Sequence, residues 1–171
     1  MFDRTQYVVE RKLLTVLTLG ETYGVKDVNG NLLGYIKKKG KFWFFEGMDG
    51  TRQGEIRARL ARPYEVYDAQ NQLRATVVWA GGLGLRSSKW QMKDPQGQQL
   101  AIAESDFLGR NHRILAPDGS TIAQIHKKWA STRWQSYRIN ISRQGFDPFL
   151  ILSYVVVDIA QQVDVSYVSV Y

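Results

Sequence analysis

The sequence has no cysteine and only four prolines among its 171 residues. Without cysteine the chain has no disulfide bond, no thiol nucleophile, no cysteine-ligated zinc and no site for palmitoylation. Asp3 and Arg4 stand where a secretory signal would have its apolar core. These features indicate a cytoplasmic protein, and the length is that of one ordinary domain over residues 1–171.

The common catalytic signatures are also missing. The sequence contains no GxSxG nucleophile motif and no HExxH zinc motif. His112 and His126 fall in separate predicted strands, with no carboxylate at the spacing of metal ligands. Gly81-Gly-Leu-Gly84 follows a predicted strand, but the Gly-Lys-Ser/Thr sequence of a phosphate-binding loop does not follow. We therefore expect no enzymatic activity, no cofactor and no metal, although a site assembled from separate strands leaves no such signature.

The last apolar segment, from Phe149 to Val157 (FLILSYVVV), is short of the roughly 20 apolar residues that a membrane-spanning helix needs. Asp147 and Pro148 precede it as an N-cap and first helical residue would, and Asp158 with Gln161 and Gln162 marks its end. A helix that is apolar on every side must be enclosed by protein. We predict such an enclosed helix; the alternative is a buried strand, which the run of three valines favours.

The rest of the sequence has the pattern of β-hairpins. Tight-turn pairs such as Asn29-Gly30 and Asp118-Gly119 separate short apolar segments. Strands begin at Tyr23, Tyr64, Trp90 and His112, return over Leu32–Lys37, Leu73–Trp79, Leu100–Glu104 and Ile122–Trp129, and also fit Tyr7–Lys12, Phe42–Glu46, Glu55–Leu60 and Trp134–Ile141. Their irregular spacing excludes a propeller or solenoid. The pattern predicts a mainly β protein, an antiparallel meander closed into a barrel around the helix.

Alternation assigns the two faces of individual strands. Tyr137, Ile139 and Ile141 are expected to face the interior, while Trp134 and Arg138 face outward. The segment Phe42-Trp-Phe-Phe45 is aromatic on both faces. Its outer side therefore needs a covering element or an apolar partner.

Basic residues are the only candidate binding groups. The net charge is +7 and the isoelectric point is about 9.7, which suits an anionic partner such as a lipid surface or nucleic acid. One group, called here the tryptophan-flanked cluster, comprises Lys127, Lys128, Trp129, Arg133, Trp134 and Arg138. A second group, the lysine cluster, comprises Lys37, Lys38, Lys39 and Lys41. The simpler interpretation of each cluster is an ordinary solvated turn.

Four parts of the chain resemble the LURP-one-related proteins, which share a superfamily with tubby C-terminal domains and phospholipid scramblases. These parts are Tyr7-Val-Val-Glu-Arg-Lys12, the hairpin from Tyr23 to Leu33, Tyr64-Glu-Val-Tyr-Asp68, and the closing apolar segment with Asp158. The resemblance covers nearly the whole chain. It implies a twelve-stranded barrel, built as two six-stranded halves, around a central hydrophobic C-terminal helix. It also implies membrane-linked roles, namely phosphoinositide binding in tubby domains and lipid scrambling in scramblases.

The sequence departs from these relatives at two sites. Scramblases carry an acidic calcium-binding segment before the final helix, whereas the stretch from Asn140 to Asp147 has one carboxylate, too few for calcium. The basic strand motif of tubby domains has no counterpart to which residues can be matched. No site residue is therefore transferred from the family.

The sequence thus predicts a non-enzymatic cytoplasmic barrel that binds anionic phospholipid or phosphoinositide headgroups. The tryptophan-flanked cluster is the first candidate site and the lysine cluster the second, because cations bind phosphate and tryptophan favours the headgroup level of a membrane. One alternative is a barrel that binds single-stranded nucleic acid, since basic strands with aromatic residues also suit base stacking. Another is a membrane protein that scrambles phospholipids.

Overall fold

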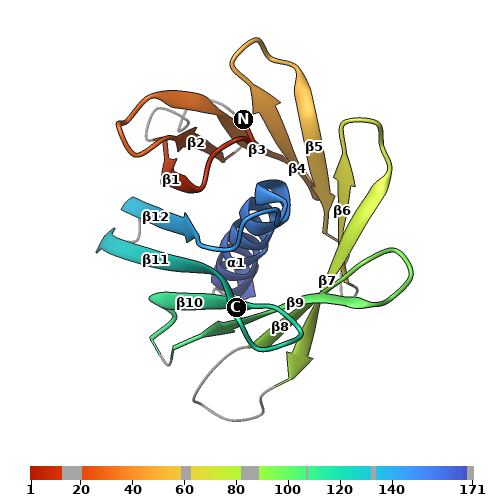
Figure 1. Cartoon of the computed structure of the whole chain (residues 1–171). Coiled ribbons are helices and arrows are strands. Elements are labelled where there is room, and N and C mark those ends of the chain that lie inside the picture. Colours follow the sequence, from red (N-terminus) through yellow and green to blue (C-terminus); the bar gives the residue numbers. More distant parts are fainter. Residues whose placement is uncertain (13–20, 59–62, 82–88, 107, 132–133, 169–171) are drawn as a thin grey trace.

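The computed structural model describes residues 1–12, 21–58, 63–81, 89–106, 108–131 and 134–168. In these residues twelve antiparallel strands form a closed barrel, and one helix lies along its interior (Figure 1). The elements are β1 (Gln6–Arg11), β2 (Thr22–Lys26), β3 (Leu32–Lys39), β4 (Phe42–Gly47), β5 (Arg52–Arg57), β6 (Tyr64–Asp68), β7 (Leu73–Gly81), β8 (Lys89–Lys93), β9 (Gln99–Ser105), β10 (Asn111–Leu115), β11 (Thr121–Ser131), β12 (Trp134–Ile141) and α1 (Pro148–Val168). The predicted fold class is confirmed.

The barrel closes because the first strand pairs with the last. Gln6 of β1 lies opposite Asn140 of β12, and Glu10 lies opposite Ser136. Every other strand pairs with its sequence neighbours, so the described sheet has no open edge, which removes the risk of edge-to-edge association. The strands therefore alternate in direction around the ring.

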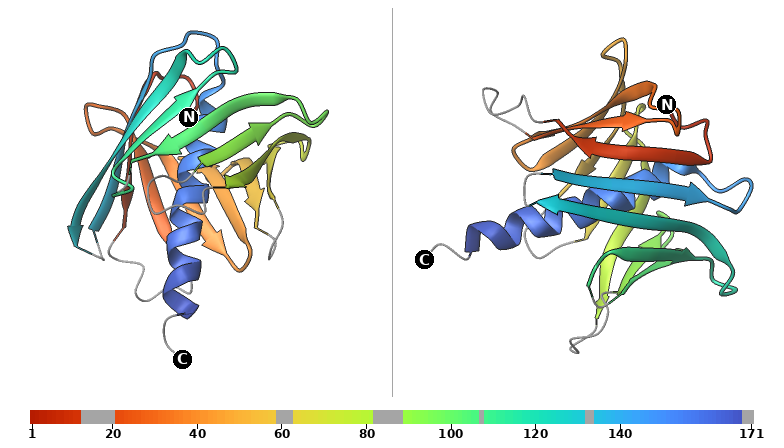
Figure 2. Two further views of the ribbon diagram at one scale, coloured as in Figure 1. Left: turned by 90° about the horizontal axis from the view of Figure 1, so that it is seen from below. Right: turned by 90° about the vertical axis from the view of Figure 1, so that its left-hand side faces the viewer.

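This alternation gives the barrel two distinct ends. Helix α1 begins at the end where β12 finishes, called here the entry end, and its last turns emerge at the opposite end, the exit end (Figure 2). The hairpin turns after β2, β4, β6, β8 and β10 lie at the entry end, and the turns after β3 and β9 lie at the exit end.

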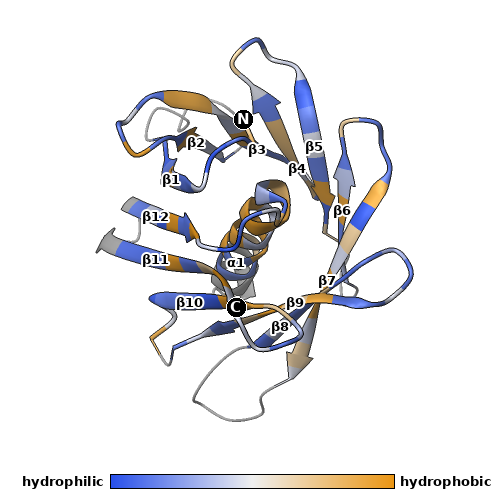
Figure 3. Cartoon of the chain, viewed as in Figure 1, coloured by the Kyte–Doolittle hydropathy of each residue, from blue (hydrophilic) through white to orange (hydrophobic). Residues whose placement is uncertain are grey.

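Helix α1 is enclosed as predicted. Asp147 caps it, since the Phe149 backbone N–H donates to the Asp147 Oδ1 at 2.9 Å. Every residue from Phe149 to Ala160 is buried except Asp158, so all faces of this part contact protein. Figure 3 shows this largely apolar helix inside the ring of strands. The helix continues to Val168, beyond its predicted end near Asp158. None of the described helices has the length and apolar character needed to cross a membrane.

The barrel wall supplies the remaining core by alternation. Tyr137, Ile139 and Ile141 face inward and are buried, while Arg138 is exposed, as expected. Gly54 of β5 leaves room for the first turn of the helix, because a Cβ atom at Gly54 would lie 2.6 Å from Cζ of Phe149. The small residue lets strand and helix approach each other closely.

Candidate functional site

Lys127 does not belong to a surface site, and the prediction that it binds lipid headgroups is wrong. Its side chain points into the barrel and is buried, with 2% of the residue exposed. It shares the inner face of β11 with Ala123 and Ile125, as the two-residue period of a strand requires. There the Lys127 Nζ lies 3.1 Å from the Asp158 Oδ2 of the helix.

Asp158 is the centre of a polar network inside the barrel. Its Oδ2 accepts hydrogen bonds from the Tyr137 hydroxyl at 2.9 Å and from the Gln162 Nε2 at 2.7 Å, in addition to the contact with Lys127. Its Oδ1 lies 4.0 Å from the His112 Nε2. The Tyr154 hydroxyl donates to the His112 Nδ1 at 2.9 Å. The network thus joins α1 to β10, β11 and β12.

Burial shifts the titration of this network. It lowers the pKa of Lys127 and of His112, and in both cases the charge of Asp158 opposes that effect. Burial, followed by the charge of Asp158, raises the pKa of Tyr137 and of Tyr154. Burial favours the neutral form of His112, in which the Nε2–H donates to the Gly109 carbonyl and the Nδ1 accepts from the Tyr154 hydroxyl. The donors and acceptors satisfy one another, so the network serves to position the helix.

Two members of the tryptophan-flanked cluster are exposed at the barrel surface. Lys128 lies on the outer face of β11 and Arg138 on that of β12. Among the described residues, neither has an acidic partner within ion-pair distance. Arg133 and the side chains of Trp129 and Trp134 lie outside the part that the structure describes, so their predicted role remains a prediction.

Arg138 borders an outer groove that sequence reasoning missed. The groove has a volume of about 560 Å³, and its described lining contains no acidic residue. His126 and Arg113 also line it, together with the side-chain amides of Gln124 and Asn140. Alternation along β10 and β11 is the sequence signal that places these side chains outward. The His126 Nδ1 lies 2.7 Å from the Asn111 Oδ1, and this contact orients the ring.

The lysine cluster divides between the two faces of β3. Lys37 faces outward and forms an ion pair with Glu46. Lys38 shares the inner face with Ile36, and its Nζ lies 5.4 Å from the ring centroid of Trp43. Lys39 and Lys41 are exposed at the turn between β3 and β4. Lys39 and Lys41 are therefore the exposed members of the cluster, whereas Lys37 and Lys38 are partly buried.

The fold brings exposed members of both clusters to the same end of the barrel. Lys39 and Lys41 lie at the exit end, and Lys128 lies on the outer wall near it. The exposed side chains of Lys12, Lys89 and Arg110 lie there too. So do three large exposed apolar side chains, Phe42, Trp79 and Leu108, whose residues are 41%, 57% and 60% exposed. These nine residues are called here the exit-end rim.

Several turns at the entry end begin with an acidic residue. Asp27, Asp49 and Asp118 each accept hydrogen bonds from the turn that they begin. The pKa of each carboxyl is lowered mainly by a side-chain hydrogen bond that it accepts, from Asn31, Thr51 and Ser120 respectively. They therefore stay ionised at neutral pH. Asp106, in the turn after β9 at the exit end, also has a lowered pKa, because the effect of burial is outweighed by hydrogen bonds from Arg110 and Asn111.

No group of three or more histidines and carboxylates within the described ranges is arranged to hold a metal ion. The family model described as LURP-one-related matches residues 5–158. An X-ray structure of a protein from Arabidopsis thaliana is similar in fold, with a TM-score of 0.61, 17% sequence identity, and coverage of 89% of this chain and 88% of that one. A comparison with curated proteins finds no match. The matched family, whose expected twelve-stranded barrel and central helix are both present, identifies this chain as a member of the LURP-one-related family.

Proposed function

We propose that this protein is a non-enzymatic barrel that binds anionic phospholipid at a membrane surface through the exit-end rim. The observation that carries the proposal is the meeting of exposed cations and exposed apolar side chains at one end of the barrel. A cation close to an anionic leaflet contributes about 1 kcal/mol. Tryptophan favours the headgroup level of a bilayer, and Trp79 is 57% exposed.

The acidic turns at the entry end and the cations of the exit-end rim support one orientation on a membrane. The ionised turns that contain Asp27, Asp49 and Asp118 lie at the entry end. An anionic leaflet repels that end and attracts the rim. Helix α1 also emerges at the exit end and therefore points its C-terminal turns toward the bilayer (Figure 2). In this proposal the protein is cytoplasmic and peripheral to the membrane.

Co-sedimentation with liposomes tests the proposal. The rim variant replaces Lys39, Arg110 and Lys128 with Gln, and it should lose roughly a hundredfold in affinity for vesicles that contain phosphatidylserine, because three charges are removed. Binding by the parent should also weaken with salt. Vesicles of phosphatidylcholine alone should bind neither protein well.

A matched control replaces three exposed cations away from the rim, Arg4, Arg113 and Arg143, with Gln. This control has the same net charge as the rim variant but keeps the rim, so it should bind nearly as the parent does. Equal losses in the two variants would mean that only total charge matters and would contradict the proposed orientation. Transfer of labelled lipid between leaflets, measured on the same vesicles, separates binding from scrambling.

A further inference from the structure

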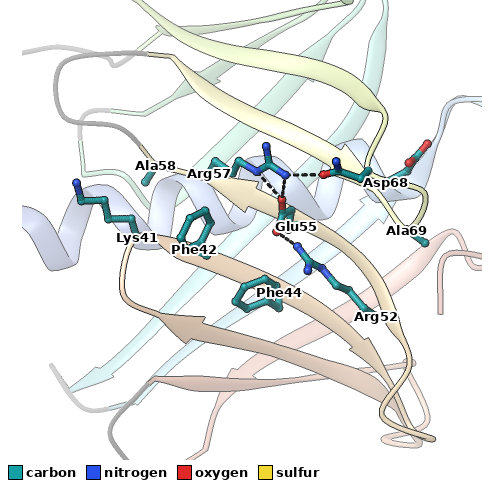
Figure 4. Close-up of a pocket in the computed structure, with 10 residues that line it drawn as sticks. Lys41, Phe42, Phe44, Arg52, Glu55, Arg57, Ala58, Asp68 and Ala69 are labelled. Atoms are coloured by element: carbon teal, nitrogen blue, oxygen red, sulfur yellow. Dashed lines mark hydrogen bonds and ion pairs between the residues drawn. The ribbon is translucent and has the colours of Figure 1, made fainter.

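A second outer groove lies over β4, β5 and β6, on the wall opposite the groove beside Arg138. It has a volume of about 770 Å³ and lies within the size range of small-molecule sites (Figure 4). Its lining combines aromatic rings, three cations, two carboxylates and an amide.

The groove has an aromatic floor that the core does not use. Trp43 and Phe45 point inward and are buried, so Phe42 and Phe44 must point outward. The two outer rings lie side by side, with centroids 6.1 Å apart and planes 26° from parallel. Phe42 is 41% exposed. The Arg52 guanidinium lies over the Phe44 ring, but no described helix or strand covers the pair, so the open part of Phe42 offers a stacking surface for a flat ring.

Two arginines are fixed beside this floor. Glu55 is 3% exposed and forms ion pairs with both Arg52 and Arg57 (Figure 4). The Arg52 guanidinium lies 4.4 Å from the Phe44 ring centroid, and that of Arg57 lies 3.8 Å from the Tyr67 centroid. Stacking and ion pairing hold each guanidinium in place before a ligand arrives, which lowers the entropy cost of binding.

The arginines retain capacity for an anion. Arg57 has two described partners, Glu55 and Asn71, and they contact its Nε and Nη2. The two N–H groups of Nη1 therefore remain for a ligand. Lys41 adds a third cation at the exit-end side of the groove. Glu55 neutralises one of these charges. Asp68 is engaged by the backbone N–H groups of its own turn and by Arg74, 3.6 Å away.

We propose that this groove binds a nucleotide, with the base stacked on Phe42 and Phe44 and the phosphate held by Arg52, Arg57 and Lys41. A base supplies the flat ring that suits the floor, and a phosphate suits fixed guanidinium groups. A ligand with only one of these parts would leave half of the groove unused. The nucleotide is either a free monophosphate or part of a single strand, because both carry the same base and phosphate.

Calorimetric titration tests this proposal with adenosine 5′-monophosphate, adenosine, inorganic phosphate and a twelve-residue oligothymidylate. The monophosphate should bind more tightly than adenosine or phosphate alone. Phe44→Ala should weaken it by about 5- to 150-fold, the value of one base stack, and Arg52→Gln should weaken the monophosphate but not adenosine. Met48→Ala and Arg113→Gln are the controls, because both residues are exposed outside this groove, and both should bind as the parent does.

The oligonucleotide distinguishes the two sources of the ligand. Tighter binding of the oligonucleotide than of the monophosphate assigns the groove to single strands, and the reverse order assigns it to free nucleotides. Binding that is insensitive to both Phe44→Ala and Arg52→Gln, or no binding of any probe, would overturn the proposal. Arg52→Gln leaves the rim cations in place and should bind liposomes like the parent, so this inference and the proposed membrane function fail independently.

Discussion

Lys127 and Lys128 are adjacent in the sequence but have opposite environments. Lys128 projects into solvent from the outer wall, whereas Lys127 lies in the interior beside Asp158. A lysine placed in an apolar interior loses its hydration, and the nearby carboxylate compensates for part of that cost. The pair therefore fixes how far the helix is inserted and how it is rotated.

Breaking the interior ion pair should destabilise the protein. Lys127→Met leaves the Asp158 carboxylate with Tyr137 and Gln162 as its remaining hydrogen-bond partners. Loss of one member of a buried pair typically costs about 3–5 kcal/mol, and because Asp158 is 19% exposed we expect the lower part of that range. Urea denaturation followed by circular dichroism measures the free energy of unfolding.

Two further variants show whether a loss of stability in Lys127→Met comes from the ion pair with Asp158. Lys128→Met has the same chemistry at an exposed position and should change stability by no more than about 0.5 kcal/mol. Adding Asp158→Leu to Lys127→Met removes both charges, and the double variant should be more stable than the sum of the single changes predicts. Additive effects would show that the two groups do not interact.

At the scale of elements, turn chemistry predicts the hairpins well, but strand and helix ends depend on tertiary contacts. The predicted strand Glu55–Leu60 begins three residues earlier, at Arg52. The alternation pattern does not reveal this start, because the inward position of Gly54 carries no apolar side chain. Phe149 of the helix fills the space at that position. Asp158 similarly suggests a helix end, yet it is an interior partner of Lys127. Neither fact follows from local sequence.

The same limit applies to the candidate site. Strict alternation along β11 places Lys127 with Ile125, so its burial was available from the sequence once the register was applied. The sequence does not show that Lys39, Arg110 and Lys128 meet at one end, because that arrangement follows from the closure of the barrel. Arg52 and Arg57 flank Glu55 within one strand, but their exposed aromatic floor comes from β4.

Helix α1 should tolerate no charge at its centre. Val156 is fully buried, and Val156→Asp places a carboxylate among apolar side chains without a partner. The cost is several kcal/mol, a large part of the roughly 5–15 kcal/mol that stabilises a domain. Loss of the cooperative thermal transition is the expected result in circular dichroism. Val28→Asp changes a valine that is 60% exposed and should melt close to the parent.

At the scale of the whole molecule, barrel closure links the two ends of the chain. Strands β1 and β12 pair directly, and the last element of the chain fills the interior that all strands line. A part of the barrel that opened alone would expose the helix and break the pairing of its strands with their neighbours. The two six-stranded halves expected from the family resemblance therefore share one core, and neither half buries its apolar face without the helix.

The protein should consequently unfold in one cooperative transition. Trp43 lies in the first half of the barrel and is 1% exposed, so a change in tryptophan fluorescence includes the opening of that half. Far-ultraviolet circular dichroism reports the loss of strands and helix in both halves. The two urea curves should coincide in midpoint and slope, as two-state unfolding requires. Separate midpoints would show that one half retains its structure after the other has opened, which a shared helix does not allow.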